Sequence, residues 1–539
     1  MKIILFISLL LSIITLCLGG ATVFVDQAST NTEATCGSTI ALACQNLQTG
    51  FAMVMADPDT SATSMNVATG TYKGAVNGNI QFYNRSVTIY GSVGTIFDLT
   101  GVAPYFFNLA PAAGVVVTDA DVTQLTINEI AVINFDGTAT NGSLFFSASA
   151  SINVGIEIRN SNFTNILGTT GSIANFDNAD GKVNDGAVVF DGCIFTNVKS
   201  TMSAIQTLLV PVTITLCTFT QNDARYMIYV SFGALSITKN SFVNNNLTTL
   251  SVGSLIYGAN IRSDPYVVTS NVFNNNQVYG ASILTLSATM VSIKNNVFSN
   301  SQNNAVICGR SDITINNCTF TNNTGNKFGQ VYGTSSCNVD VLNSNFTGNS
   351  ALYGAAISSV PAGNVIAIQS SNFYNNAGTN GGAIFLNQTT ATLLNLVING
   401  NKASGAGAAV YSTQSSDITF ENVTLNNNSA SIAPSISCDG NSTLFFGPNV
   451  SGSGNIDYNK KETALVVCDN TVSGGCSIDG DIDGVCGKTN GKSGNNGGGL
   501  SNGAIAGIVI GVIIGLAILV LVIYIVYKRH HNSIKYRSF

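Results

Sequence analysis

The sequence predicts a parallel β-helix, a solenoid in which short strands stack coil upon coil. One short phrase keeps returning: a strand of alternating apolar residues, then an aromatic residue, then asparagines, as in DITINNCTFTNN from Asp312. Ile313 and Ile315 show the period of 2 that is typical of strands. Asn, Gly, Thr and Ser dominate the connections, which are too short for crossover helices. Together these observations favour an all-β solenoid over helical repeats.

The period of the repeat sets the size of one coil. The aromatic residue, or an aliphatic residue in its place, marks each coil: Phe135, Phe163, Phe195, Phe219, Phe242, Phe273, Phe298, Phe320, Phe346, Phe373, Ile398 and Leu425. These markers span 290 residues in 11 intervals, a mean period of about 26. One such unit cannot bury its apolar face alone, so neighbouring units must stack. We therefore expect about twelve coils, with inward side chains packed on their own kind in the next coil.

Asparagines recur three residues after the markers. They are Asn245, Asn276, Asn323, Asn349, Asn376, Asn401 and Asn428. Asparagine tolerates the left-handed conformation that a sharp corner needs, and stacked amides can bond one another. We therefore predict structural corners at these positions, with their amides forming a ladder.

A second strand between the markers carries a resemblance to a known family. Gly381 to Ile384 (GGAI) precedes Ile398 to Asn401, and Phe346 to Asn349 and Phe373 to Asn376 read FxxN. This pairing resembles the polymorphic outer-membrane-protein repeat over roughly residues 130 to 430. The resemblance implies a right-handed, pectin-lyase-like β-helix, a fold that hosts both enzymes and adhesins. After Asn449 the chain departs from that family, because a single apolar helix stands where the family would have an outer-membrane barrel.

The first hundred residues predict a secreted chain with a capped solenoid. Residues 1–20 read as a signal peptide, with Lys2 before an apolar run. Residues 21–96 resemble the entry segment of pectin-lyase-like folds, and residues 97–450 hold the repeats. Leu42, Leu47, Phe51 and Val54 suit an amphipathic helix that covers the open end of the rod. In an oxidising compartment the short loop from Cys36 to Cys44 predicts a disulfide.

The last ninety residues predict a membrane anchor. Residues 451–487 are rich in Cys and Asp, and residues 488–502 form a Gly-, Asn- and Ser-rich linker. Residues 504–527 contain no charge and are long enough to span a bilayer. The basic tail, residues 528–539, is expected to be cytoplasmic, which places the N-terminus outside. The protein is therefore expected to be a type I, single-pass protein of the cell membrane. Four glycines spaced by four residues favour a homodimer or another membrane partner: Gly503, Gly507, Gly511 and Gly515. Glycine also occurs in such spans without a partner.

Composition excludes several functions. Charged residues are only 9% of the chain, and residues 21–502 hold 16 Lys and Arg against 27 Asp and Glu. This net negative charge does not suit a protein that binds nucleic acid. The two histidines, His530 and His531, lie in the tail, so the exterior has no Ser-His, Cys-His or His-metal site. Exterior acids fall at different offsets of the repeat, which indicates solvated corners: Asp191, Asp223, Asp264, Asp312, Asp340 and Asp417.

Two modifications are expected in the exterior. The Asn-x-Ser/Thr sequons best suited to carry glycans are Asn84, Asn141, Asn246, Asn322, Asn387, Asn427, Asn441 and Asn449. Four more sequons begin at Asn162, Asn317, Asn345 and Asn422. Cys193 and Cys217 stand one coil apart, and either a disulfide or stacked free thiols fits them.

Two features are candidate binding sites. Alternation predicts an outward row on the second strand: Tyr229, Tyr257, Leu284, Cys308, Tyr332, Ser358, Phe385 and Tyr411. Its aromatic members could stack on sugar rings or a partner protein, or simply stabilise the strands. Asp479, Asp481 and Asp483 match the opening of a calcium loop, although a plain acidic stalk fits them as well, and no other cofactor is expected.

Two functions remain open. The first is a glycosylated, non-catalytic cell-surface rod that recognises or adheres to an extracellular protein or glycan. The second is a membrane-tethered polysaccharide lyase or hydrolase, which only the fold resemblance favours. Acids and a base that converge in one groove would favour the second.

Overall fold

The structure is a computed structural model of the chain. It describes residues 22–31, 36–57, 63–112, 115, 118, 121–147, 153–177, 186–247, 253–260, 265–288, 290–360, 363–458 and 476–480. The chain divides into two units, 1–487 and 488–539, and the second lies wholly outside the described residues. The predicted signal peptide, linker, membrane span, tail, glycine stripe and the pair Asp481 and Asp483 also fall outside them. Among the helices of the described residues, none has the length and apolar character of a membrane span.

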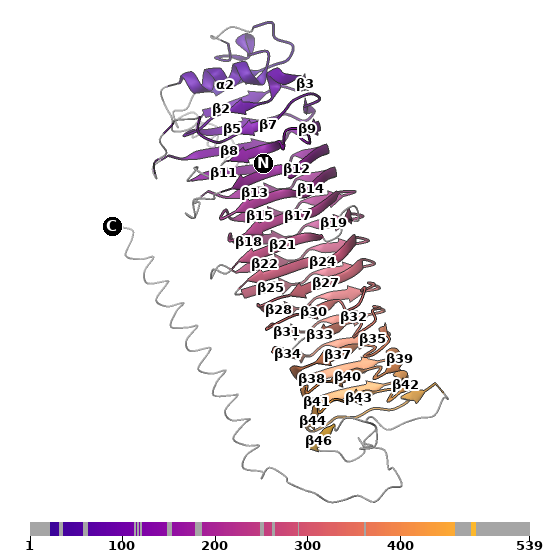
Figure 1. Ribbon diagram of the computed structural model, residues 1–539. Coiled ribbons are helices and arrows are strands. Elements are labelled where there is room, and N and C mark those ends of the chain that lie inside the picture. Colours follow the sequence, from indigo (N-terminus) through magenta and orange to yellow (C-terminus); the bar gives the residue numbers. More distant parts are fainter. Residues whose placement is uncertain are drawn as a thin grey trace, which may run out of the picture. The chain divides into compact units, whose positions relative to one another are not determined.

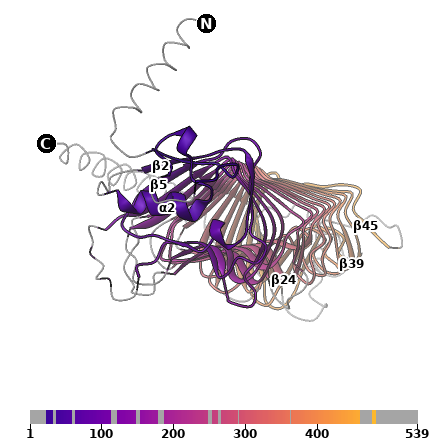
Figure 2. The same ribbon diagram turned by 90° about the horizontal axis from the view of Figure 1, so that it is seen from above.

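The first unit is a parallel β-helix with three faces. Its coils follow one another along the stack in Figure 1 and are drawn as a series of offset loops in Figure 2. Every pairing between its named strands is parallel and joins one coil to the next, as expected for the predicted solenoid. The in-register column that contains the marker phenylalanines begins at Tyr72 and ends at Leu425, and the solenoid has about 13 turns, close to the twelve expected.

The first face carries the alternating apolar strands that precede each marker. Its strands are β1 (Thr22–Val25), β2 (Thr63–Val67), β5 (Ser86–Tyr90), β8 (Thr123–Asn128), β11 (Val154–Arg159), β13 (Val188–Asp191), β15 (Val212–Thr215), β18 (Leu235–Thr238), β22 (Tyr266–Thr269), β25 (Met290–Lys294), β28 (Asp312–Asn316), β31 (Asn338–Leu342), β34 (Asn364–Gln369), β38 (Thr389–Asn399), β41 (Asp417–Asn426), β44 (Thr443–Phe446) and β46 (Ser477–Gly480).

The second face, named here the phenylalanine face, carries the markers. Its strands are β3 (Gly70–Lys73), β6 (Thr95–Asp98), β9 (Ala131–Asp136), β12 (Asn162–Asp177), β14 (Ile194–Leu208), β16 (Thr218–Thr220), β19 (Ser241–Val243), β23 (Val272–Asn274), β26 (Val297–Ser299), β29 (Thr319–Thr321), β32 (Asn345–Thr347), β35 (Asn372–Tyr374) and the ends of β38 and β41. Rings from Phe163 to Phe373 are fully buried and stack with centroids 4.5 to 5.2 Å apart and interplanar angles of 12° or less.

The third face, named here the tyrosine face, carries Tyr229 and Tyr257. Its strands are β4 (Ile80–Gln81), β7 (Tyr105–Asn108), β10 (Ser143–Ser147), the ends of β12 and β14, β17 (Asp223–Ser231), β21 (Ser254–Asn260), β24 (Gln277–Ala288), β27 (Gln302–Cys308), β30 (Val331–Gly333), β33 (Ile357–Ser359), β37 (Ile384–Asn387), β40 (Val410–Thr413) and β43 (Ile436–Cys438). Short strands line the corner before it: β20 (Asn246–Leu247), β36 (Ala377–Gly378), β39 (Lys402–Ala406), β42 (Ser429–Ile432) and β45 (Ile456–Asp457).

A helix lies across the N-terminal end of the stack. Helix α2 (Leu47–Ala56) buries Leu47, Phe51 and Val54, and the Phe51 ring lies 5.5 Å from the rings of Phe82 and Phe107. Asn46 caps it, because its side chain accepts a hydrogen bond from the Thr49 amide at 2.9 Å. The 3-10 turns η1 (Ile40–Leu42) and η2 (Ala75–Asn77) flank it in sequence. Leu42 was expected inside the helix but ends η1, where its side chain is 48% exposed.

A buried ladder of asparagine side chains runs along the corner after the phenylalanine face. Asn376 shows the pattern: its Nδ2 donates to the Phe346 carbonyl and to Asn401 Oδ1, both at 3.0 Å, while its Oδ1 accepts from the Asn349 amide at 3.0 Å. The seven predicted members belong to this ladder, and Asn222, Ser301 and Asn455 extend or bridge it. The ladder therefore satisfies buried backbone groups and fixes the register of successive coils.

The sequence predictions were wrong in two details, one about the corners and one about the markers. The left-handed residue is not the ladder asparagine but its predecessor, such as Asn244, Asn375 or Asn427, with φ values of 56°, 54° and 51°. One residue makes the turn and the next makes the ladder. Phe135 is also not in the marker column: Phe163 pairs with Val132, and Phe135 pairs with Ile166 just past the corner.

The glycines of the GGA-type strands are required by the backbone. Gly354, Gly381 and Gly407 have φ values of 51°, 63° and 62°. A Cβ atom on Gly381 would lie 2.3 Å from the Ile384 carbonyl oxygen, so no side chain fits there.

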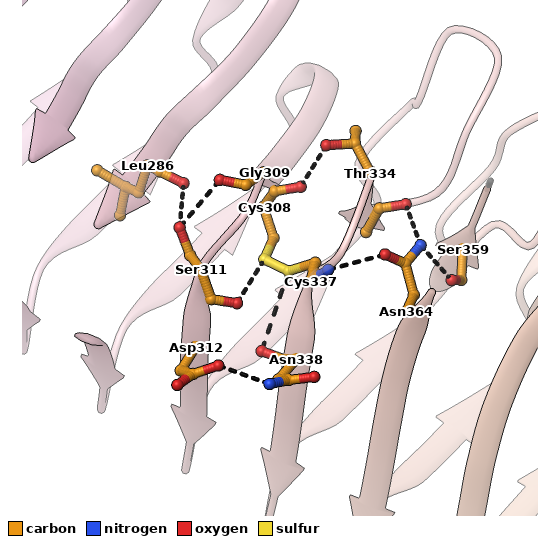
Figure 3. Close-up of a disulfide and its surroundings, with 11 residues drawn as sticks. Leu286, Cys308, Gly309, Ser311, Asp312, Thr334, Cys337, Asn338, Ser359 and Asn364 are labelled. Carbon is orange, nitrogen blue, oxygen red and sulfur yellow. Dashed lines mark hydrogen bonds between the residues drawn. A yellow bond between two sulfur atoms is a disulfide. The ribbon is translucent and has the colours of Figure 1, made fainter. Parts of the chain in front are cut away.

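Cysteines occupy corners of the stack. Cys36–Cys44, Cys308–Cys337 and Cys438–Cys476 are disulfides. Figure 3 shows Cys308 at the end of one coil bonded to Cys337 of the next, whose amide donates to Asn364 Oδ1 at 2.9 Å. Among the described cysteines, Cys193, Cys217 and Cys318 are free and buried, so the stacked-thiol alternative holds for the first two.

The three free thiols act as members of a second ladder, at the corner before the phenylalanine face. Cys217 Sγ contacts the Phe190 carbonyl, as the Asn240 amide contacts the Ile214 carbonyl one coil later. The hydrogen bond with Cys193 and burial raise the pKa of Cys217, and burial raises the pKa of Cys318 to about 11. The thiols of Cys217 and Cys318 therefore stay protonated at neutral pH.

Replacing Asn376 by Ala should destabilise the fold by about 3 kcal/mol, because the Asn349 amide and the Phe346 carbonyl would lose buried partners. Asn376 does not have a positive φ, so alanine introduces no backbone strain there. Urea unfolding followed by circular dichroism measures the change. The control is Asn372→Ala, which removes only the half-exposed bond to Asn345 and should change the stability by less than about 0.5 kcal/mol. Equal effects of the two substitutions would refute the role of the ladder.

Candidate functional site

The predicted aromatic row exists on the tyrosine face as one outward column. In register it contains Tyr229, Tyr257, Thr285, Ile307, Tyr332, Ser358, Phe385, Tyr411 and Ser437. Two predicted members were wrong, because Leu284 and Cys308 are fully buried and point inward. The irregular strands β24 and β27 shift the alternation by one residue relative to the sequence pattern.

The row is less exposed than expected. Tyr229, Tyr257, Tyr332 and Tyr411 are half-buried, and Phe385 is only 6% exposed. Aromatic residues outside the column pack against it and cover it in part: Tyr226, Phe328 and Tyr353. Alternation within the strand could not reveal these neighbours, which come from a strand irregularity and from the turns before β30 and β33.

The N-terminal part of the row is a cluster of three tyrosines. The rings of Tyr229 and Tyr257 stack with centroids 5.1 Å apart and planes 4° apart. Tyr226 packs against them at 5.4 and 5.0 Å, with its plane tilted by about 50°. Because the stacked rings cover each other's faces, a ligand along this row meets ring edges and hydroxyl groups.

The C-terminal part of the row is a longer cluster. Phe328 stacks on Tyr332 at 4.2 Å, and Tyr353 joins Phe328 to Phe385 with centroid distances of 6.1 and 5.0 Å. Phe385 stacks on Tyr411 at 5.5 Å, and the Tyr411 hydroxyl donates to Asp439 Oδ2. Tyr411 is thus held in place by a carboxylate on the next coil.

Each cluster includes a cation that sequence reasoning did not identify. The Arg225 guanidinium lies 5.3 Å from the centre of the Tyr226 ring, and Lys327 Nζ lies 5.1 Å from the centre of the Phe328 ring. Both cations directly precede their aromatic partner in the chain, so an Arg-Tyr or Lys-Phe dipeptide beside the row was the available signal. Cation–π contact of this kind orients a positive charge at the edge of the aromatic surface.

A shallow depression of about 210 Å³ adjoins the tyrosine cluster along β14 and β17. It is lined by Thr138, Leu167, Gly168, Lys199, Ser200, Thr201 and Asp223. Lys199 and Asp223 are register partners on neighbouring coils. The depression therefore combines one base and one acid with hydroxyl groups, and its Asp223 lies in the strand that carries Tyr226 and Tyr229.

The other acids of the described residues lie outside this depression, and Lys73 and Asp98 form a second Lys–Asp pair of register partners, 3.7 Å apart. Burial raises the pKa of Asp340, with a smaller contribution from the charge of Asp312 on the preceding coil. No group of three His, Cys, Asp or Glu side chains in the described ranges could hold a metal ion. Asp479, the one residue of the calcium-loop motif that is described, lies in β46 and accepts a hydrogen bond from the Gly480 amide at 2.7 Å.

The predicted sequons lie at the surface with one exception. Asn84, Asn141, Asn246, Asn322, Asn427, Asn441 and Asn449 are exposed. Asn387 is half-buried, and its Oδ1 atom is buried. Attachment of a sugar would be easiest at the exposed seven.

Comparison with known proteins concerns the fold. Residues 281–480 match the family model of the right handed beta helix region. The solenoid is a right-handed β-helix. No curated protein matches the sequence.

Two solved structures with this solenoid architecture are similar to the β-helix. The A-module of the mannuronan C-5 epimerase of Azotobacter vinelandii is 12% identical, over 72% of this chain and 91% of that chain, with a TM-score of 0.33. The catalytic domain of a GH87 α-1,3-glucanase in complex with nigerose is 11% identical, over 77% of this chain and 67% of that chain, with a TM-score of 0.27. Neither likeness bears on what this chain does.

Burial should raise the pKa of three tyrosines of the row, Tyr257, Tyr332 and Tyr411, above the ordinary tyrosine value. Burial raises the pKa of Tyr257 and Tyr332, and burial together with the bond to Asp439 raises the pKa of Tyr411. An unfolded tyrosine titrates near pH 10. The raised pKa values therefore contribute stability that is complete below about pH 10 and is lost as the pH rises through the folded values. Ultraviolet titration of the native protein should show a late-titrating fraction that Tyr411→Phe reduces by one tyrosine, with the earlier phase unchanged. Loss of amplitude from the early phase instead would contradict the assignment.

Proposed function

We propose that the chain is a non-catalytic recognition rod of the cell surface, secreted, glycosylated and anchored by one membrane span, that binds an extracellular protein or glycan through the tyrosine face. The observation that supports the proposal is the aromatic column. Its half-buried members form two clusters, each with a cation at its edge. Aromatic residues flanked by Arg are enriched in protein binding sites, where they supply contact area at a small cost in conformational entropy.

The geometry of the stack defines how such a ligand would be bound. Tyr229 and Tyr257 turn their edges outward, so their hydroxyl groups are the available polar atoms along the column. The Tyr257 hydroxyl is protonated at neutral pH, as an ordinary tyrosine is, and burial raises its pKa further, so it can donate as well as accept. A ligand rich in hydroxyl or carbonyl groups fits this surface better than a purely apolar one.

The tyrosine cluster is the best place to test this proposal. Replacing Tyr226, Tyr229 and Tyr257 together by Ser should weaken binding at least tenfold, about 1.4 kcal/mol, because the stacked surface would be lost. Binding of the detergent-solubilised full chain to whole cells and to an array of polysaccharides is the measurement. Triple replacement by Phe is a second variant that retains the rings and removes only the hydroxyl groups.

The matched control is Tyr374→Ser, a half-exposed tyrosine on the phenylalanine face. It should leave binding unchanged. Proteolytic resistance and circular dichroism establish that each variant is folded. Unchanged binding by a folded Ser triple variant would exclude the tyrosine cluster as the ligand surface.

A second function, a polysaccharide lyase or hydrolase, is favoured by one observation. The depression beside the tyrosine cluster pairs Lys199 with Asp223, a base and an acid on adjacent coils. Acid and base groups positioned around one bond are what such chemistry needs. The pair provides one carboxylate, whereas hydrolysis by the common two-carboxylate mechanism requires a second.

If the depression is catalytic, the full chain should produce new reducing ends or unsaturated uronates from a panel of polysaccharides. Lys199→Ala and Asp223→Asn should then each lower the rate by at least about a hundredfold. Lys402→Ala, an exposed lysine on the same edge of the rod, is the control and should leave the rate unchanged. Activity that survives both groove substitutions would remove this site from consideration, and absence of product from every substrate would favour the recognition rod.

A further inference from the structure

The corners around the phenylalanine face have a backbone pattern that coincides with the N-glycosylation sequon. At the corner before this face, Asn317, Asn422 and Asn449 are left-handed, with φ values of 52°, 52° and 60°. The residue after each asparagine points inward, and the third residue begins the next strand with its side chain outward. These three positions form a sequon wherever the third residue is Ser or Thr. Asn422 shows this order, since Val423 is buried and Thr424 is half-exposed.

The corner after the phenylalanine face repeats the pattern. Asn322 and Asn427 are left-handed and exposed, with φ values of 53° and 51°. The residues that follow them, Asn323 and Asn428, are buried members of the ladder, and the third residues, Thr324 and Ser429, face outward. Sequons thus recur at the places where the chain is most exposed.

The sequons are consequently distributed unevenly around the rod. Nine of the twelve lie on the phenylalanine face or its two corners: Asn141, Asn162, Asn246, Asn317, Asn322, Asn345, Asn422, Asn427 and Asn449. On the tyrosine face, the column from Tyr229 to Tyr411 meets one sequon, Asn387 at the end of β37. The Oδ1 atom of Asn387 is buried, and the Thr389 side chain of the same sequon is only 2% exposed.

We propose that N-linked glycans coat the phenylalanine face and its two corners, and that the column from Tyr229 to Tyr411 on the tyrosine face stays bare. This inference rests on the secretory route of the proposed function, and it does not depend on what the tyrosine face binds. In the modification, the Asn Nδ2 atom displaces the diphosphate of a lipid-linked oligosaccharide from C1 of the first sugar. One amide proton is lost, an N–C bond replaces the C–O bond, and lipid diphosphate leaves.

The hydrogen bonds at these corners are compatible with the modification. Asn427 Nδ2 donates to Asn399 Oδ1 at 3.0 Å, and Asn449 Nδ2 donates to Asn422 Oδ1 at 2.8 Å. A glycosylated asparagine keeps one N–H and its carbonyl oxygen. Each of these side chains therefore retains its bond to the neighbouring coil while the sugar points into solvent.

Mapping the occupied sites tests the proposal. The full chain, produced in a eukaryotic secretory host, is deglycosylated enzymatically in heavy-oxygen water, which converts each occupied Asn to labelled Asp. Peptide mass spectrometry should find the label at Asn322, Asn427 and Asn449 and none at Asn387. Label at Asn387, or none at the corner sites, would overturn the proposal.

A pair of substitutions separates modification from folding. Thr324→Ala should abolish the label at Asn322, whereas Thr324→Ser should retain it. Both substitutions keep the left-handed asparagine and its exposed position. Ligand binding by the tyrosine face is measured on the same enzymatically deglycosylated protein. Binding that persists in a protein without any label at the corners would refute the glycan coat and leave the recognition proposal intact. Binding that is lost in the Ser triple variant, while the corner labels remain, would identify the ligand surface independently of the glycans.

Discussion

The buried asparagine ladder is the interaction on which the regularity of this solenoid depends. At each corner the backbone turns away from its strand partner, which would leave an amide and a carbonyl unpaired in the interior. The ladder side chain supplies both missing partners, since Asn349 Oδ1 accepts from the Asn323 amide and its Nδ2 donates to the Phe320 carbonyl. Because each side chain also bonds the next coil, a shift of one residue would break bonds on both sides. The ladder thus enforces the same register that the inward phenylalanines need in order to stack.

The division of each corner into a turning residue and a ladder residue explains several features that otherwise look unrelated. Asparagine pairs such as Asn244-Asn245 recur because one must accept a positive φ and the other must carry an amide into the interior. Gly348 and Gly400 replace the turning residue where only conformational freedom is required. Other polar side chains replace the amide at some positions. Cys217 Sγ reaches the Phe190 carbonyl of the preceding coil, as a ladder amide would, whereas Ser301 Oγ donates to the Ser299 carbonyl of its own coil. The three free cysteines are therefore best understood as hydrogen-bonding side chains.

The fold could be predicted from sequence to a large extent because its signals are local and repeated. Alternation decides which side chains face inward, and the mean spacing of the markers gives the coil length, although single intervals vary, as between Phe219, Phe242 and Phe273. The errors occurred where the repeat is incomplete. Phe135 lies in the column that later becomes the asparagine ladder, ahead of Ile166, Val198 and Asn222, so an apolar residue there looked like a marker. One sequence cannot distinguish an early, apolar ladder position from a true marker, since both are buried.

The aromatic column was harder to predict, because its environment depends on turns rather than on strands. Alternation places Tyr332 and Phe385 outward, and it cannot anticipate that Phe328 and Tyr353 fold over them. That cover alters the functional argument. An open strip of aromatic faces would favour stacking on flat sugar rings, whereas stacked, half-buried rings expose edges, hydroxyl groups and the flanking cations Arg225 and Lys327. Under the proposed function such a surface suits a polar ligand that contacts two successive coils, because Tyr229 and Tyr257 stack on neighbouring coils.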